Sequence, residues 1–190
     1  MNFRKHHKRK YVLPAGTVWT FALKWSPLHN KHTIHGLWYD GGDDSRADEP
    51  VLKASEQWSN SIIPILESTQ MNPQPPHSSK DAKSLKEFMD LLWAHDWKND
   101  HMPNIDLWHH EWKFHGAYMP NPWYDYDGHT HNPTGEFTAD APAFFSYGIS
   151  LYYRMINEIH PLDITNRSSV EFYFDENFKE IRSKYTLSED

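Results

Sequence analysis

The chain has 190 residues, a length that fits one folded domain, and a formal net charge of -7. It contains no cysteine, which excludes disulfides, thiolate metal sites and a cysteine nucleophile. No run of about 18 apolar residues occurs, so we expect no transmembrane helix and no membrane partner. Aromatic residues make up 15% of the chain and should supply much of its core.

Residues 1–14 form a basic segment that includes Arg4, Lys5 and Lys8. No apolar stretch follows them, so the segment is not typical of an intact signal peptide. We expect a solvated arm, with contact to a polyanion as the alternative. The absence of cysteine slightly favours a cytoplasmic location over a secreted one. Residues 15–190 are expected to form a single domain, because no linker or internal repeat interrupts them.

The first half of the chain contains two predicted strands and a predicted helix. Residues 17–25 and 33–38 carry the alternation that is typical of strands. Residues 53–67 are expected to form a helix, although Pro64 predicts a break or a kink. Residues 68–83 are rich in proline and serine and are expected to form a loop.

Two further helices are predicted before the middle of the chain ends. One covers residues 84–97, beginning at Ser84 as its N-cap, and keeps apolar side chains at helical spacing. The other covers residues 105–114, and Asn104 is expected to cap it.

The last third of the chain begins with a predicted loop at residues 117–140. A long apolar helix is expected over residues 141–159, followed by a strand at 169–174. A turn at 175–177 should return the chain so that residues 178–183 pair with that strand. Strands at both ends and helices between them predict an α+β domain, with a mostly antiparallel central sheet flanked by helices.

The segment TIHGLWYD at residues 33–40 is the first candidate for chemistry. Successive side chains of a strand face opposite sides, so an inward Ile34 would turn His35 toward solvent or a cleft. Gly36 would let a ligand or another backbone approach closely. By itself, His35 is more typical of an ordinary surface histidine.

The segment HHEWKFHG at residues 109–116 is the second candidate. Glu111 and His115 are four residues apart and share a helix face. His110 and His115 lie about 140° apart around a helix, so we expect them to flank a cleft without forming a compact pair. The metalloprotease motif H-E-x-x-H requires histidine where Phe114 stands, which argues against that class. A different zinc site among the 14 histidines remains open.

Together, the motifs I-H-G-L-W and H-E-W-x-x-H-G resemble the two active-site segments of the ribonuclease T2 family. The resemblance extends to FALKWSP, AFFSYGISLYYRMINEI and VEFYFDENFKEI, and so covers roughly residues 15 to 185. It implies a ribonuclease T2-like fold. It also implies cleavage of single-stranded RNA through a 2′,3′-cyclic phosphate, with little base preference, no metal and no cofactor. We expect such an enzyme to act as a monomer.

The resemblance also implies roles for four residues. His35 matches the general acid toward the leaving 5′-oxygen, and His115 matches the general base on the 2′-hydroxyl. His110 matches the histidine that holds phosphate, and Glu111 matches the carboxylate that stabilises the transition state or tunes its neighbours. Histidine suits both proton transfers because its ordinary pKa lies near working pH.

Base binding is implied for Trp38 and Asp40, because an exposed tryptophan offers a face on which any base can stack. Tyr39 stands where the family has proline, which should reshape this pocket. The 14 histidines would move the formal charge from -7 to +7 if all were protonated. RNA binding should therefore strengthen in mildly acidic solution.

Phe114 stands where the family has a lysine, whose positive charge lies near the scissile phosphate. Lys113 and Lys24 are candidate substitutes, although Lys113 lies about 100° away around the helix. The family cysteine after this motif is also absent, since Ala117 and Tyr118 occupy that region. An active endoribonuclease is the leading hypothesis. The alternatives are a catalytically weakened RNA-binding protein that retains the fold, and a metal-dependent hydrolase.

Overall fold

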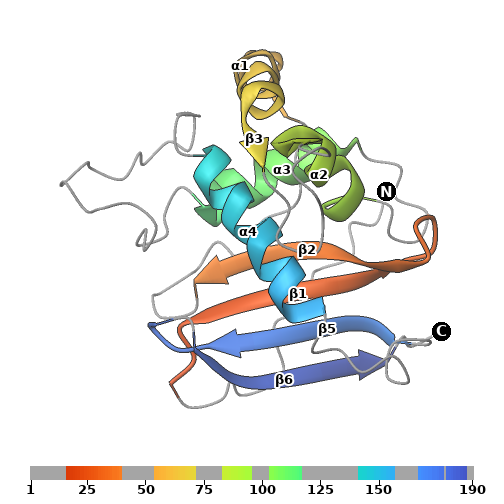
Figure 1. The fold of residues 1–190 in the computed structure, drawn as a ribbon, viewed down its shortest axis with the longest axis vertical. Coiled ribbons are helices and arrows are strands. Elements are labelled where there is room, and N and C mark those ends of the chain that lie inside the picture. The colour runs from red at the N-terminus through yellow and green to blue at the C-terminus, as the bar shows by residue number, and fades with distance from the viewer. Residues whose placement is uncertain are drawn as a thin grey trace, which may run out of the picture.

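A four-stranded antiparallel sheet forms one layer of the protein (Figure 1). Its strand order is β2-β1-β5-β6. β5 therefore lies between β1, the strand nearest the N-terminus, and β6, the strand nearest the C-terminus. The bounds are β1 Trp19–Ser26, β2 Lys31–Tyr39, β5 Arg167–Phe174 and β6 Glu180–Leu187. The computed structural model describes residues 16–39, 54–71, 83–95, 103–116, 141–156, 167–177 and 179–187.

The predicted C-terminal hairpin is present, the two predicted N-terminal strands also pair as a hairpin, and the prediction of an α+β protein with an antiparallel sheet is confirmed. β1 pairs with β2 on one side and with β5 on the other, which joins the N-terminal hairpin to the C-terminal one. The predicted basic arm at residues 1–14 and the predicted long loop at residues 117–140 lie outside the described residues.

Four helices accompany the sheet in the described part of the chain. Figure 1 shows α4 crossing one face of the sheet, while α1, α2 and α3 gather beyond the β2 edge. None of these helices is long and apolar enough to cross a membrane. The helix bounds are α1 Glu56–Ser68, α2 Leu85–Leu92, α3 Asn104–Phe114 and α4 Ala141–Ile156.

Two expectations about helix α1 and its surroundings were wrong in detail. Pro64 does not break α1, which continues through it to Ser68. Both Pro64 and Asn60, whose carbonyl loses its helical donor, lie at exposed positions, where water can replace the missing bond. The expected loop at 68–83 contains short strands at both ends, β3 Gln70–Met71 and β4 Lys83–Ser84, which pair with each other.

The N-cap predicted from the sequence is correct for α2 and wrong for α3. Ser84 is the N-cap of α2 as predicted, and it forms a reciprocal capping box with Glu87. Asn104 is not the cap of α3, because it is already helical and Pro103 precedes it. The Asn104 side chain instead accepts a hydrogen bond of 2.9 Å from the backbone N–H of His95. α2 ends at Leu92, earlier than the expected residue 97.

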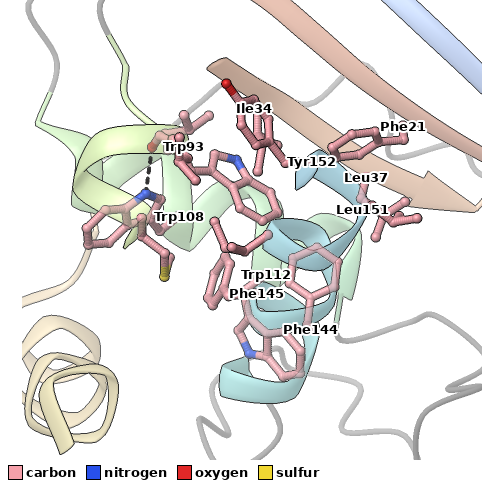
Figure 2. Close-up of a cluster of buried hydrophobic side chains, with 14 of the residues drawn as sticks. Phe21, Ile34, Leu37, Trp93, Trp108, Trp112, Phe144, Phe145, Leu151 and Tyr152 are labelled. Atoms are coloured by element: carbon pink, nitrogen blue, oxygen red, sulfur yellow. Dashed lines mark hydrogen bonds between the residues drawn. The ribbon is translucent and has the colours of Figure 1, made fainter. Parts of the chain in front are cut away.

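The core is rich in aromatic side chains, as the composition predicted (Figure 2). Trp93 lies within 5.7 Å of the Phe144 ring and 5.2 Å of the Phe145 ring, measured between centroids. Trp112 of α3 lies 6.0 Å from Phe144. These contacts fix α3 and α4 against the end of α2.

Two buried hydrogen bonds hold α3 in place. The indole N–H of Trp108 donates to the Trp93 carbonyl at 2.8 Å (Figure 2). The backbone N–H of Ala54, just before α1, donates to the Asp106 carboxylate at 2.7 Å. Because an unmade buried hydrogen bond is costly, both bonds restrict where α3 can sit.

Gly148→Ala is expected to lower the free energy of unfolding by about 1–3 kcal/mol. A Cβ at Gly148 would lie 2.5 Å from a Trp93 ring carbon, and that ring is fully buried. Alanine favours a helix by up to about 1 kcal/mol relative to glycine, which opposes the loss without cancelling it. Urea denaturation measures the difference.

Ser150→Ala on the same helix is the matched control, because Ser150 is exposed. It should change stability by no more than about 0.5 kcal/mol. Equal effects of the two substitutions would mean that the contact between Gly148 and Trp93 is not a tight one.

Candidate active site

A β-bulge in strand β2 positions the first histidine. Ala22 pairs with Gly36 and Leu23 pairs with Ile34, so His35 is the extra residue on β2. Bulges of this kind bend a strand and redirect a side chain. Ile34 is fully buried and His35 is half-buried, which confirms that the two face different surroundings.

The bulge also brings His35 and Trp38 together. Residues three apart on a regular strand point to opposite faces, but here the two ring centroids lie 6.0 Å apart, edge to face. The extra residue likewise allows Ile34 and Leu37, also three apart, to be buried in one core (Figure 2). The strand thus separates a core side from a side that carries the candidate chemistry.

The end of α3 supplies the other three candidate residues. One ligand atom each from His110, Glu111 and His115 lies within 4.8 Å of the others, and all three side chains are buried. The rings of His110 and His115 are 5.4 Å apart between centroids. The expectation that these histidines do not form a compact pair was therefore wrong. α3 ends at Phe114, and His115 has φ -123° and ψ -65°, so the helical angle between them does not apply.

Strand β2 and helix α3 meet through the Glu111 side chain. Its carboxylate accepts a hydrogen bond from the backbone N–H of Leu37, which lowers its pKa, but burial is the larger effect and raises the pKa well above 4.5. Oε2 of Glu111 has no hydrogen-bond partner among the described residues. Gly36 makes the approach possible, because a Cβ there would lie 2.6 Å from that oxygen.

Trp38 is buried, with only 8% of its surface exposed, so the expectation of an exposed stacking face was wrong. Its ring lies 6.0 Å from His35 and 5.9 Å from His115 between centroids. The indole therefore contacts both the histidine of β2 and the histidine that follows α3. Aromatic pairs at such distances fix ring positions as well as burying area.

Phe114 and Lys113 lie beside this cluster. The Phe114 ring is 5.1 Å from the His110 ring, and the Lys113 amino group is 5.6 Å from the Phe114 centroid. Lys113 also lowers the pKa of His109, although burial of His109 is the larger cause. The His109 ring lies 4.9 Å from the ring of Trp58 of α1, measured between centroids.

The remaining candidates are placed only in part. Lys24 pairs with Thr33 in the β1/β2 register, two residues from His35. Asp40 lies outside the described residues, and Tyr39 is described only as the last residue of β2. Any base-binding role of Asp40 stays a prediction.

Sequence reasoning missed three features that shape the cluster. The bulge at His35 had one signal, the apolar pair Ile34 and Leu37 at an odd spacing. The contact between Gly36 and Glu111 had no local signal, because it joins distant segments. The packing of Phe114 on His110 follows from their helical spacing of four residues, which is a local signal in the sequence.

Chemically, the arrangement brings imidazole and carboxyl side chains, the groups that most often transfer protons in enzymes, around one buried indole. His35 and His115 approach the same indole from different elements, and His110 and Glu111 stand beside His115. Comparisons with protein-family models, curated proteins and solved structures find no match to this chain.

Glu111→Gln is expected to remove part of the pH dependence of stability. Burial raises the pKa of Glu111 in the folded state, so the unfolded chain ionises first as the pH rises. The wild-type protein should therefore lose stability as the pH rises from 4.5, the ordinary pKa of glutamate, through the raised pKa of Glu111 in the folded state. Glutamine has the same shape and no charge. Urea denaturation in EDTA should show the variant gaining stability relative to the wild type as the pH rises above about 4.

Glu67→Gln on α1 is the control, because the Glu67 side chain is exposed. Its stability should follow that of the wild type across the pH range. Parallel curves for Glu111→Gln and the wild type would contradict the assignment of Glu111 as a group that burial keeps protonated.

Proposed function

We propose that this protein is an endoribonuclease of the ribonuclease T2 type. It cleaves single-stranded RNA by transphosphorylation, which leaves a 2′,3′-cyclic phosphate, with little base preference. The observation that carries the proposal is the convergence of four side chains from two elements. His35 comes from β2, and His110, Glu111 and His115 come from the end of α3, as the motif resemblance requires.

In this proposal, His115 takes the proton from the ribose 2′-hydroxyl, whose oxygen then attacks the phosphorus. The bond from phosphorus to the 5′-oxygen breaks, and His35 gives a proton to that leaving oxygen. The enzyme supplies a base and an acid while RNA supplies the nucleophile, which DNA lacks. His35 and His115 each lie about 6 Å from the Trp38 ring between centroids, so one buried indole positions both the proposed acid and the proposed base.

Charge stabilisation falls to His110 and Glu111. A protonated His110 would hold a phosphate oxygen. Burial favours a protonated Glu111, which adds no repulsion toward phosphate and can donate a hydrogen bond. Trp38 is buried, so we assign it the positioning of the two histidines rather than base stacking.

The first experiment is digestion of a single-stranded RNA homopolymer at pH 5 and pH 7 in excess EDTA, with analysis of the product ends. Cyclic-phosphate ends in EDTA are the expected result. RNA binding without cleavage at either pH would favour the weakened RNA-binding protein, for which the packing of Phe114 on His110 is the motivating observation. Cleavage that EDTA abolishes would favour a metal-dependent hydrolase.

His35→Ala and His115→Ala should each reduce kcat by about 10²–10⁴-fold, because each removes a proton-transfer group. Single-turnover cleavage of the same RNA measures the loss, and near-UV circular dichroism checks the fold. His109→Ala is the matched control, since His109 packs on Trp58 and not on the cluster. Near-normal turnover in either of the first two variants would refute the assigned roles.

Phe114→Lys should raise kcat by roughly tenfold or more, because it returns a positive charge beside His110, where the transition state carries negative charge. Phe114→Met, which changes the ring without adding charge, separates the charge from the loss of the aromatic contact. A fall in kcat for both variants would mean that the Phe114 ring is needed to position His110.

A further inference from the structure

A metal-capable donor set lies at the centre of the proposed site. His110, Glu111 and His115 each offer one ligand atom, and those atoms all lie within 4.8 Å of one another. Two imidazoles and one carboxylate form the protein ligands of many zinc sites that keep a fourth position open. We propose that this cluster binds one Zn²⁺ ion, and that the bound ion blocks RNA cleavage. Zinc binding stands independently, whereas the block rests on the proposed ribonuclease function.

The state of Glu111 is the independent observation that points to a ligand. Only 4% of the residue is exposed, and Oε2 has no hydrogen-bond partner among the described residues. A buried polar oxygen left in this state is costly, and a cation would supply the missing interaction. The Leu37 N–H meanwhile donates to the same carboxylate, as a second layer of hydrogen bonds does for metal ligands.

The spacing of the donor atoms fits closure around zinc. Bonds of about 2.0–2.1 Å in a tetrahedral site place ligand atoms about 3.3 Å apart. The three donors lie within 4.8 Å of one another, so closing the set needs shifts of at most about 1.5 Å. His115 can contribute such a shift by rotation, because it follows the last helical residue and has non-helical backbone angles.

The replacement of lysine by phenylalanine makes the cluster more suitable for a dication. Phe114 packs 5.1 Å from His110, so an uncharged ring occupies the place where the resemblance expects a fixed positive charge. A lysine there would repel Zn²⁺, and this repulsion is strong where water is excluded. The Lys113 amino group lies on the Phe114 ring, 5.6 Å from its centroid.

Zinc and proton transfer compete for the same atoms. A histidine nitrogen that coordinates zinc has donated its lone pair and cannot accept the 2′-hydroxyl proton. Zinc on His115 therefore removes the general base, and zinc on His110 removes the phosphate contact. His35 is not among the three donors, so zinc leaves the general acid in place.

The test of the site is zinc binding to the full chain, measured by equilibrium dialysis without RNA. The wild type should bind one tight ion, and the affinity should fall at least about tenfold in His110→Ala, Glu111→Gln and His115→Ala. His109→Ala should bind within about twofold of the wild type, and it corrects for weak binding by the other histidines. Co²⁺ should give the visible absorption of a tetrahedral complex in the wild type and lose it in Glu111→Gln, whose fold circular dichroism checks.

The test of the block is cleavage of the RNA homopolymer by EDTA-treated, dialysed protein as zinc is added. Activity should fall with a midpoint that matches the dissociation constant from dialysis, and EDTA should restore it. Equal zinc affinity in the three ligand variants and in His109→Ala would overturn the site. Cleavage that requires zinc would overturn the block. Zinc binding at the cluster with no cleavage under any condition would support the site and reject the ribonuclease.

Discussion

The hydrogen bond from the Leu37 backbone to the Glu111 carboxylate joins the two halves of this protein's candidate site. β2 is the outermost strand of the described sheet on that side, and the N–H groups along such an edge need partners. Glu111 supplies one from the end of α3, and Gly36 leaves just enough room for it. His35 and Trp38 belong to the strand, while His110 and His115 belong to the helix end. This junction and the contact between the Trp38 and His115 rings therefore set their mutual positions.

Aromatic packing holds the junction without covalent help, since the chain has no cysteine. Trp93 lies against Phe144 and Phe145 of α4, and Trp112 extends the cluster into α3. Large rings bury much area for little conformational entropy, and their contacts are directional. The site is consequently built on a strand and a helix end that a packed core supports, rather than on a loop.

The sequence predicted the four strands of the main sheet and the four helices, because alternation and helical spacing are local patterns. The pairing of β1 with β5 and the short strands β3 and β4 were not predicted. The compact pairing of His110 and His115 was not predictable from a helical wheel, because the helix stops at Phe114. The burial of Trp38 depends on His115, which is distant in sequence. The bulge at His35 reversed the side on which Trp38 lies, and only the spacing of Ile34 and Leu37 hinted at it.

One buried oxygen connects the two proposals. Oε2 of Glu111 has no protein partner among the described residues. A buried negative charge without a partner is costly, so either a proton or a cation should neutralise this carboxylate. In the proposed ribonuclease, a proton on Glu111 leaves His110 and His115 available for phosphate and for the 2′-hydroxyl, whereas in the proposed zinc complex the ion uses their lone pairs. The two states cannot coexist in one molecule, because they need the same three side chains. The two proposals thus make acid–base chemistry and metal binding alternatives at the end of α3, with His35 on β2 relevant only to the first.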